Sequence, residues 1–201
     1  MIAILDYGSG NIRSAQRAFE KAGAEVVVTA DFESALNAKG LVIPGVGAFG
    51  ACMEGLLAVR GDEIILQRLA AGRKIFGICV GMQILFAESD ELYKGKKASG
   101  VGIFPQKVVR LTAPVLPHIG WNSLSKVPQG PVFQGLDQER FYFVHSYAVQ
   151  KQVSEANNIM SNYGEEFVAA IEGELITATQ FHPEKSGRAG LKLIENWVKT
   201  I

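Results

Sequence analysis

Cysteine, net charge and long apolar runs are what this sequence has least of, and each shortage excludes a class of protein. Its two cysteines, Cys52 and Cys79, cannot form a disulfide framework, and they lack the spacing of a metal-binding motif. Twenty basic residues balance twenty acidic ones, so the charge does not indicate a nucleic acid or an anionic membrane as partner. No apolar stretch is long enough to span a bilayer, and residues 2–5 are too short for a secretion signal. We therefore expect a cytoplasmic protein with neither metal nor other cofactor.

The stretch around Cys79 carries the most information in the chain. An apolar run at 75–78 predicts a buried strand, and the pattern Gly-x-Cys-x-Gly leads from it into a helical segment predicted at 80–88. Strand, tight turn and helix are typical of a nucleophile elbow, here with sulfur in place of oxygen. Gly77 and Gly81 fit this reading because a tight turn leaves no room for a Cβ on either side of the nucleophile. A buried structural cysteine is the alternative, but a plain core strand gains nothing from two flanking glycines.

The order of apolar and turn segments predicts an α/β fold. Strands alternate with helices in the first half, which indicates a mostly parallel, doubly wound central sheet flanked by helices. The second half has several strands and little helix, which indicates antiparallel additions, and a closing helix follows. We expect residues 1–201 to form a single domain. The predicted strands are 1–5, 26–28, 41–43, 75–78, 101–104, 108–111, 141–144, 167–171 and 175–181, and the predicted helices are 12–22, 51–59, 62–71, 80–88 and 187–199.

A cysteine nucleophile requires a base, and His182 is the best candidate among three histidines. It follows an apolar strand, and Glu184 stands two residues later with Pro183 between them. Residues two apart in an extended chain share a face, so the carboxylate can fix the tautomer of the imidazole. A lone histidine after a strand is more often a hydrogen-bonded loop residue. His118 and His145 lack such a carboxylate, and we interpret both as structural or substrate-side.

Two glycine-rich loops follow predicted strands and allow different interpretations. The loop Gly45-Val46-Gly47 exposes backbone amides, which next to an elbow is what an oxyanion hole requires. Taken alone, it would be an ordinary strand-to-helix loop. The pair Gly8 and Gly10 suggests a dinucleotide site, but the third glycine of that motif is missing, so we reject a cofactor there. Cys52 lies in a predicted helix among apolar residues, and we interpret it as packing.

Together these motifs resemble the class I, triad-type glutamine amidotransferases. The resemblance rests on 77–83 (GICVGMQ) and 182–184 (HPE), and it spans nearly the whole chain. Further stretches are similar to the glutaminase subunits of imidazole glycerol phosphate synthase, which act in histidine biosynthesis. Those stretches are 6–11 (DYGSGN), 44–49 (PGVGAF), 117–122 (PHIGWN), 141–147 (FYFVHSY) and 180–186 (QFHPEKS).

The resemblance implies a flavodoxin-like sheet and a reaction. Glutamine is hydrolysed to glutamate and ammonia through a cysteinyl thioester. The ammonia passes to a cyclase subunit with a (β/α)8 barrel, forming a heterodimer. That subunit makes imidazole glycerol phosphate and an aminoimidazole carboxamide ribotide.

The resemblance also assigns roles to individual residues. It implies Cys79 as nucleophile, His182 as base and Glu184 as its orienter. Val80 and the 45–47 loop depart slightly from the usual pattern, since leucine is more common at the first and Gly-Gly in the second. The remaining implied positions are the oxyanion amides of Val46, Gly47 and Val80, the glutamine-holding Gln83, Glu91, Ser146 and Tyr147, and the cyclase-facing Asn11, Trp121, Asn122 and Lys185.

Several readings remain open from the residues alone, because a Cys-His-Glu set fits any acyl transfer. One is a glutaminase subunit of another amidotransferase, and another is a cysteine peptidase or a hydrolase of small amides. A third is a scaffold subunit that retains an inactive triad. Release of glutamate that depends on glutamine separates these possibilities.

Overall fold

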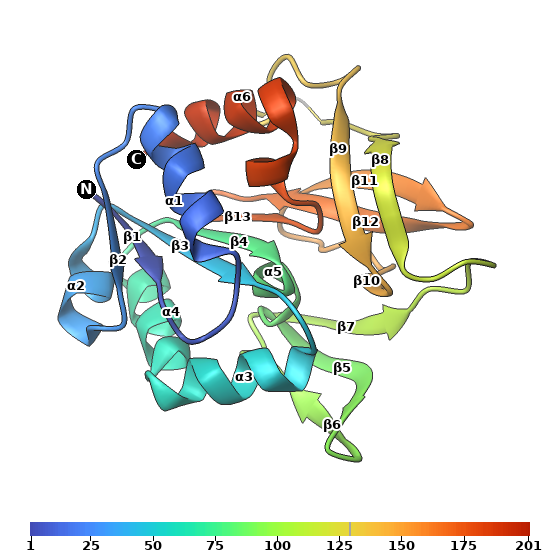
Figure 1. Cartoon of the computed structure of the whole chain (residues 1–201), viewed down its shortest axis with the longest axis horizontal. Coiled ribbons are helices and arrows are strands. Elements are labelled where there is room, and N and C mark those ends of the chain that lie inside the picture. Colours follow the sequence, from blue (N-terminus) through green and yellow to red (C-terminus); the bar gives the residue numbers. More distant parts are fainter. Residues whose placement is uncertain (129) are drawn as a thin grey trace.

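The fold is built on a seven-stranded sheet, seen in a computed structural model that describes residues 1–128 and 130–201 (Figure 1). The strand order is β11-β12-β13-β4-β3-β1-β2. From β2 to β13 all neighbours pair in parallel, in the flavodoxin-like order, whereas β12 and β11 are added antiparallel. This confirms the predicted fold class. The sheet strands are β1 (Ile2–Leu5), β2 (Val26–Thr29), β3 (Gly40–Gly45), β4 (Ile75–Cys79), β11 (Asn157–Tyr163), β12 (Glu165–Glu172) and β13 (Ile176–Thr179).

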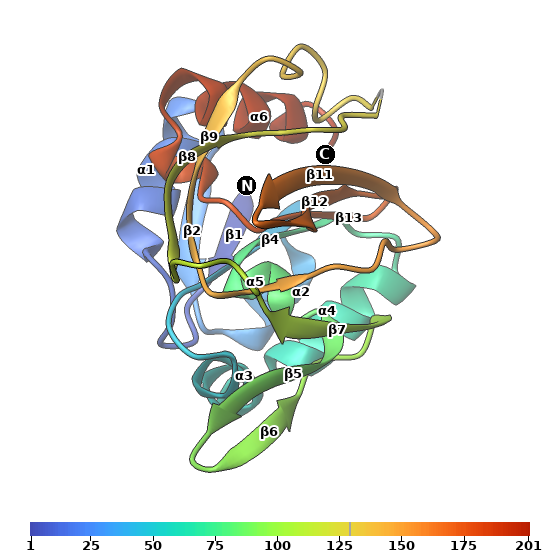
Figure 2. The same cartoon turned by 90° about the vertical axis from the view of Figure 1, so that its right-hand side faces the viewer.

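Helices cover both faces of this sheet, which is why its central strands are apolar throughout. Every residue of β3 and of β4 is buried, as expected for parallel strands between two helical layers. Helices α1 (Ile12–Lys21) and α6 (Gly187–Val198) lie on one face, and α3 (Phe49–Ala58) and α4 (Gly61–Ala70) lie on the other (Figures 1 and 2). On the first face Phe19 of α1 packs edge-on against Trp197 of α6, with ring centroids 5.7 Å apart. The short α2 (Phe32–Asn37) packs against α4.

A buried cation joins α2 to α4. Arg68 of α4 has no exposed surface, and its guanidinium donates to five backbone carbonyls rather than to a carboxylate. Three of these carbonyls, those of Ala35, Leu36 and Ala38, close the end of α2, where a helix leaves its last carbonyls unpaired. Arg68 therefore satisfies the end of one helix from the side of another.

Two smaller sheets are added in the second half of the chain. One has the order β10-β7-β5-β6, and the other is the hairpin β8-β9, which stands across β11 and β12 (Figure 1). Aromatic rings pack between this hairpin and the seven-stranded sheet. His118 of β8 stacks on Tyr163 of β11, with ring centroids 3.9 Å apart. The bounds of these elements are β5 (Phe86–Tyr93), β6 (Lys96–Ser99), β7 (Phe104–Arg110), β8 (His118–Ser123), β9 (Arg140–His145) and β10 (Tyr147–Val149), with a 3₁₀ turn η1 at Pro183–Lys185.

The predicted helix at 80–88 is wrong in its second half. Helix α5 comprises only Val80–Gln83, and Phe86 already begins β5. The cause is a distant segment that takes the carbonyls a longer helix would use. The amides of Val101 and Ile103 donate to the carbonyls of Ile84 and Leu85 at 2.8 and 2.9 Å. The predicted strand at 101–104 is therefore mostly a connector, and β7 begins only at Phe104.

Within residues 1–128 and 130–201, the search for a helix long and apolar enough to cross a membrane found none.

Candidate active site

The site forms at the carboxyl edge of the parallel strands, where β4 ends in Cys79. This residue has φ 56° and ψ −112°, a backbone conformation that residues with a Cβ seldom adopt, and α5 begins immediately after it. A Cβ at Gly81 would lie 1.8 Å from the carbonyl oxygen of Ile43, and one at Gly77 would lie 2.6 Å from that of Gly81. The two glycines are therefore required by close backbone contacts, as the sequence predicted for an elbow.

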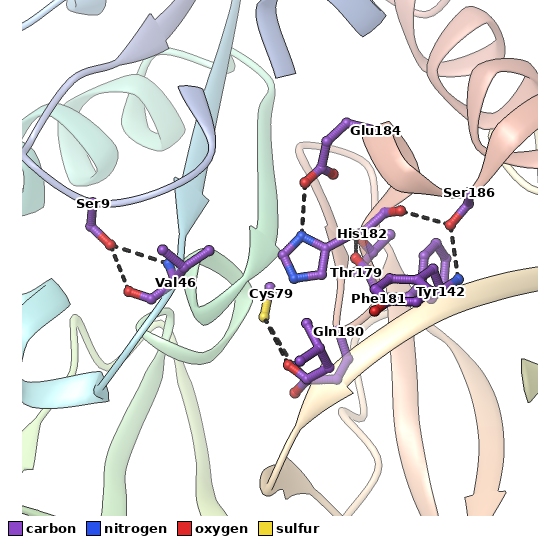
Figure 3. A network of polar contacts seen from close by, with 11 residues as sticks. Ser9, Val46, Cys79, Tyr142, Thr179, Gln180, Phe181, His182, Glu184 and Ser186 are labelled. Atoms are coloured by element: carbon purple, nitrogen blue, oxygen red, sulfur yellow. Dashed lines mark hydrogen bonds and ion pairs between the residues drawn. The ribbon is translucent and has the colours of Figure 1, made fainter. Parts of the chain in front are cut away.

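His182 and Glu184 form a buried hydrogen-bonded pair. Imidazole Nδ1 lies 2.8 Å from Glu184 Oε1, and the two side chains are 1% and 3% exposed. The expectation of an extended chain between them is wrong, because Pro183 opens a 3₁₀ turn and the two side chains meet across its start. Ser186 holds the turn by donating its hydroxyl to the His182 carbonyl at 2.6 Å (Figure 3). The pairing was predicted from the sequence, and the turn that produces it was not.

The other ring nitrogen of His182 faces Cys79. This Nε2 is buried and has no hydrogen-bond partner among the described residues, and the Cys79 sulfur lies beside it (Figure 3). Burial opposes a charge on the imidazole, but the neighbouring Cys79 sulfur and the Glu184 carboxylate together raise the pKa of His182 to about 10. The arrangement therefore favours a positively charged imidazolium beside the sulfur of Cys79, and a neighbouring cation of this kind is what activates a cysteine nucleophile.

Gln180 also contacts the sulfur, and sequence reasoning did not include it in the site. Its amide nitrogen lies 3.8 Å from Cys79 Sγ, and its side chain is buried (Figure 3). The only signal in the sequence is that Gln180 precedes His182 by two residues at the end of a strand.

A cavity of about 680 Å³ opens in front of the nucleophile. It brings together residues predicted for four roles from segments far apart in the chain. Its lining includes the catalytic candidates Cys79 and His182, the oxyanion candidates Val46, Gly47 and Val80, the glutamine-holding candidates Gln83, Glu91, Ser146 and Tyr147, and the partner-facing candidates Asn11 and Lys185.

The Val46 peptide is held by side chains behind the loop. Its N–H donates to Ser9 Oγ at 3.1 Å, while its carbonyl accepts from the same hydroxyl at 2.9 Å (Figure 3). The carbonyl also accepts from Cys52 Sγ at 3.3 Å. The Val46 amide is therefore occupied and can serve an oxyanion only after the peptide rotates. Gly47 has φ +88°, and Val80 is the first residue of α5, whose N-terminal amides the helix itself leaves unpaired. Cys52 is buried as predicted, but its thiol also takes part in this contact.

Two of the glutamine-holding candidates have internal partners. Gln83 donates its amide nitrogen to the Tyr147 carbonyl and to Gln180 Oε1, both at 2.9 Å, which leaves its oxygen as the acceptor for a ligand. Glu91 accepts from the Phe49 amide at 2.7 Å, at the start of α3. Both side chains are thus fixed before any substrate arrives.

The partner-facing candidates divide into two groups. Asn11 and Lys185 lie at the cavity, whereas Trp121 and Asn122 lie outside its lining, on β8. Trp121 is 48% exposed and Ile119 on the same strand is 60% exposed, so this hairpin presents apolar surface. Asn122 instead donates to the carbonyl of Asn162 at 2.9 Å, and its amide is turned toward the protein.

Among the described residues, no group of three His, Cys, Asp or Glu side chains has the geometry to hold a metal ion.

Sequence comparison gives close relatives along the whole chain. Residues 3–201 match the family described as glutamine amidotransferase class-I. The chain is 54% identical over 209 residues to the imidazole glycerol phosphate synthase subunit HisH of Corynebacterium glutamicum, covering 100% of this chain and 98% of that protein. It is 52% identical over 200 residues to the subunit of the same name from Mycobacterium bovis, covering 98% and 96%.

Comparison with solved structures gives the same fold at low identity. A crystal structure of a glutamine amidotransferase matches with a TM-score of 0.74 at 18% identity, covering 94% of both chains. The structure of PurLQS from Thermotoga maritima matches with a TM-score of 0.74 at 17% identity, covering 98% of this chain and 97% of that one. At such identities the likeness concerns the arrangement of the elements.

Proposed function

Because this chain belongs to the class I glutamine amidotransferases, with the HisH subunits as its relatives at 50% identity and above, we infer that its cavity is a glutaminase site. The protein hydrolyses glutamine to glutamate and ammonia, and it supplies the ammonia to the cyclase of imidazole glycerol phosphate synthase in histidine biosynthesis. The observation that carries the assignment of residues is that Cys79 and His182 line the cavity and that His182 is paired behind it with the buried Glu184. The whole of residues 1–201 acts as one glutamine amidotransferase domain.

The reaction proceeds by acyl transfer to sulfur. The Cys79 thiolate attacks the side-chain carboxamide carbon of glutamine, and the carbonyl oxygen becomes an oxyanion. His182 gives a proton to the nitrogen, the C–N bond breaks, and ammonia leaves a thioester behind. Water then attacks the thioester with His182 as base, and the intermediate collapses to glutamate and the Cys79 thiolate beside the protonated His182. In both steps Glu184 accepts the hydrogen bond from Nδ1 and stabilises the imidazolium, while Nε2 gives or takes the proton.

The cavity supplies the remaining groups of the proposed site. The Gln83 oxygen, Glu91 and the backbone of Ser146 and Tyr147 hold the glutamine. The amides of Gly47 and Val80 stabilise the oxyanion, and Val46 joins them after its peptide rotates. No cofactor takes part in these steps.

The partner is proposed to be a cyclase subunit with a (β/α)8 barrel in a cytoplasmic heterodimer. Asn11, Lys185 and the exposed Trp121 form its docking face, next to the cavity from which ammonia must leave. Asn122 supports this face from within, since its amide is turned inward.

The state of the Val46 loop connects the partner to the activity. In the free subunit the Val46 amide is bonded to Ser9, so one oxyanion donor is misaligned. The cyclase with its nucleotide bound favours the aligned state. A single oxyanion donor is worth about a hundredfold to a thousandfold in rate, and the gain belongs in turnover because the donor acts in the transition state.

The test is glutamate release from glutamine by the subunit alone, with the cyclase, and with the cyclase and its nucleotide. We expect low activity alone and stimulation of turnover in the full complex. A complex with Cys79→Ala should lose synthesis from glutamine and keep it with ammonium salt. Release from small amides or peptides but not from glutamine would assign the site to another hydrolase. Full activity of the free subunit, or stimulation only through tighter glutamine binding, would contradict the loop proposal.

A further inference from the structure

The side-chain amide of Gln180 lies within hydrogen-bonding distance of the nucleophile. It follows β13, its side chain is 1% exposed, and Nε2 lies 3.8 Å from Cys79 Sγ. It approaches the sulfur from a different side than His182 (Figure 3). Buried amides in proteins are almost always hydrogen-bonded, so the partner of this nitrogen is informative. Sulfur is a weak acceptor as a thiol, but the negative charge of a thiolate strengthens such a bond.

The direction of the Gln180 amide is fixed by Gln83. The Gln83 amide nitrogen lies 2.9 Å from the Tyr147 carbonyl and 2.9 Å from Gln180 Oε1. Because a carbonyl can only accept, the Gln83 atom between them must be the nitrogen with its two hydrogens. Oxygen of Gln180 therefore faces Gln83, and nitrogen of Gln180 faces the sulfur.

The Tyr147 carbonyl is in turn fixed by two buried histidines. It accepts from His145 Nδ1 at 3.0 Å, which leaves Nε2 of that ring as an acceptor. His118 Nδ1 lies 3.0 Å from this Nε2 and donates to it. His118 Nε2 is then an acceptor and faces the Asn122 amide nitrogen at 3.4 Å. Burial lowers the pKa of His118 to about 4 and that of His145 to about 3, so both rings are neutral, as this single set of donors requires.

These contacts form one continuous chain in which every donor meets an acceptor. It begins at Asn122 on the hairpin β8-β9 and ends at the nucleophile. The two histidines stand directly opposite each other in the β8-β9 register, so the hairpin itself sets their spacing. The complete order is Asn122, His118, His145, the Tyr147 carbonyl, Gln83, Gln180 and Cys79.

We propose that Gln180 is a further catalytic residue of this site, and that its amide N–H stabilises the Cys79 thiolate. His118 and His145 are positioning residues that act through the Tyr147 carbonyl and Gln83. The catalytic part of this proposal rests on the proposed glutaminase function. The effect of Gln180 on the reactivity of the Cys79 sulfur does not depend on which substrate the site takes. The Gln180 amide does not act as an acid or a base, so its role differs from that of His182. It acts on the thiolate before the attack on glutamine and again when hydrolysis of the thioester frees the sulfur.

The first experiment replaces Gln180 with methionine, which has similar length and no N–H, and with glutamate, which keeps an oxygen for the Gln83 amide. The readout is alkylation of Cys79 by iodoacetamide over a range of pH, followed on the peptide that contains Cys79. A hydrogen bond to a charged group is worth about tenfold to a hundredfold. Both variants should therefore lower the alkylation rate at neutral pH by about that factor and move the profile to higher pH by about one to two units. Glutamate should have the larger effect because it adds a like charge.

The same variants are then assayed with glutamine in complex with the cyclase. A donor to the nucleophile predicts a fall in kcat with KM nearly unchanged. The matched control is Gln67, which is exposed on α4, replaced with the same two residues. Alkylation of the Gln180 variants at the wild-type rate and with the wild-type pH profile would overturn the proposal. If wild-type protein failed to hydrolyse glutamine, the proposed function would fail while the alkylation result would still decide the role of Gln180.

The second experiment tests the chain through two replacements of His145 with opposite consequences. Phenylalanine preserves the packing of this ring against Phe167, whose centroid lies 5.0 Å away, but it removes both hydrogen bonds. Asparagine loses the packing but keeps a donor near the position of Nδ1. If the chain positions Gln180, Cys79 should be alkylated faster in the asparagine variant than in the phenylalanine variant. The reverse order would show that His145 serves packing and would overturn its positioning role. The Gln180→Glu variant, which is isosteric, decides the role of Gln180 even if neither His145 variant folds.

Discussion

His182 and Glu184 are separated by one proline, and their side chains meet at 2.8 Å although both are almost completely buried. The carboxylate therefore has a fixed partner before substrate binds, and its other oxygen has no hydrogen-bond partner among the described residues. A buried carboxylate with one partner depends strongly on that partner. The pair thus ties the base of the reaction to the folding of the η1 turn.

The two members of this pair should differ in importance for turnover. His182→Ala removes the group that moves the proton in both steps, so kcat should fall by at least about a hundredfold to ten-thousandfold. Glu184→Gln keeps the shape and loses only the charge, so its loss of kcat should be smaller. Glutamine hydrolysis by the assembled complex measures both. A larger loss in Glu184→Gln than in His182→Ala would require the roles to be reassigned.

The two cysteines should be separable by labelling. Cys79→Ala should abolish glutamine hydrolysis, whereas Cys52→Ser should remain near wild type because serine can still donate to the Val46 carbonyl. An electrophilic glutamine analogue should label only Cys79, which lines the cavity, since Cys52 has no exposed surface. Peptide mass spectrometry decides this, and equal labelling of Cys52 would contradict the assignment.

The hydroxyl of Ser9 should restrain the free subunit. Ser9→Ala removes the bond that occupies the Val46 N–H, and one hydrogen bond is worth about 1 kcal/mol, or roughly fivefold in a population. We therefore expect basal glutamine turnover of the free subunit to rise by about that factor, with little change in the stimulated complex. Ser9→Thr keeps the hydroxyl and is the control. A folded Ser9→Ala protein with unchanged or lower basal turnover would contradict the restraint.

The buried histidines should make the fold sensitive to acid. The pKa of His118 is lowered to about 4 and that of His145 to about 3 in the folded protein, both by burial, against an ordinary 6.5. The unfolded chain therefore binds protons at these two histidines that the folded chain does not. Their contribution to the free energy of unfolding is level above about pH 7 and falls as pH drops from 6.5 toward 3. In His145→Phe this slope should decrease by at most about 1.4 kcal/mol per pH unit.

Urea unfolding between pH 7 and 4 measures that slope, and the wild type serves as the reference for the carboxylates common to both proteins. An identical slope in His145→Phe would show that this histidine is protonated in the folded state.

The elbow and the base could be predicted because short-range spacing encodes them. Gly77, Cys79 and Gly81 lie within five residues, and His182 and Glu184 are two apart. The geometry at those positions is set mainly by the local backbone. The roles of Gln83, Glu91 and the docking residues came instead from the family resemblance, since their spacing alone indicates no chemistry.

The contacts that sequence reasoning missed join residues far apart in the chain. Gln180 reaches Cys79 across 101 positions because β13 and β4 are parallel neighbours, and Ser9 reaches Val46 across 37 because the loops after β1 and β3 converge. Strand order decides both, and no local pattern reveals it. The helix predicted at 80–88 is too long for the same reason, because residues 101 and 103 bond to the carbonyls that a longer helix would use.

The strained backbone of Cys79 favours catalysis and lowers the stability of the folded protein. A positive φ of this kind at a residue with a Cβ costs about 1–3 kcal/mol of folding free energy. The benefit of this conformation lies in the reaction with glutamine, not in the stability of the fold. Glycine at this position relieves the strain, so Cys79→Gly should melt at a higher temperature than Cys79→Ala, although both are inactive. The inactive glycine variant is thus expected to be more stable to heat than the inactive alanine variant, and the active protein keeps its nucleophile at a cost in thermal stability.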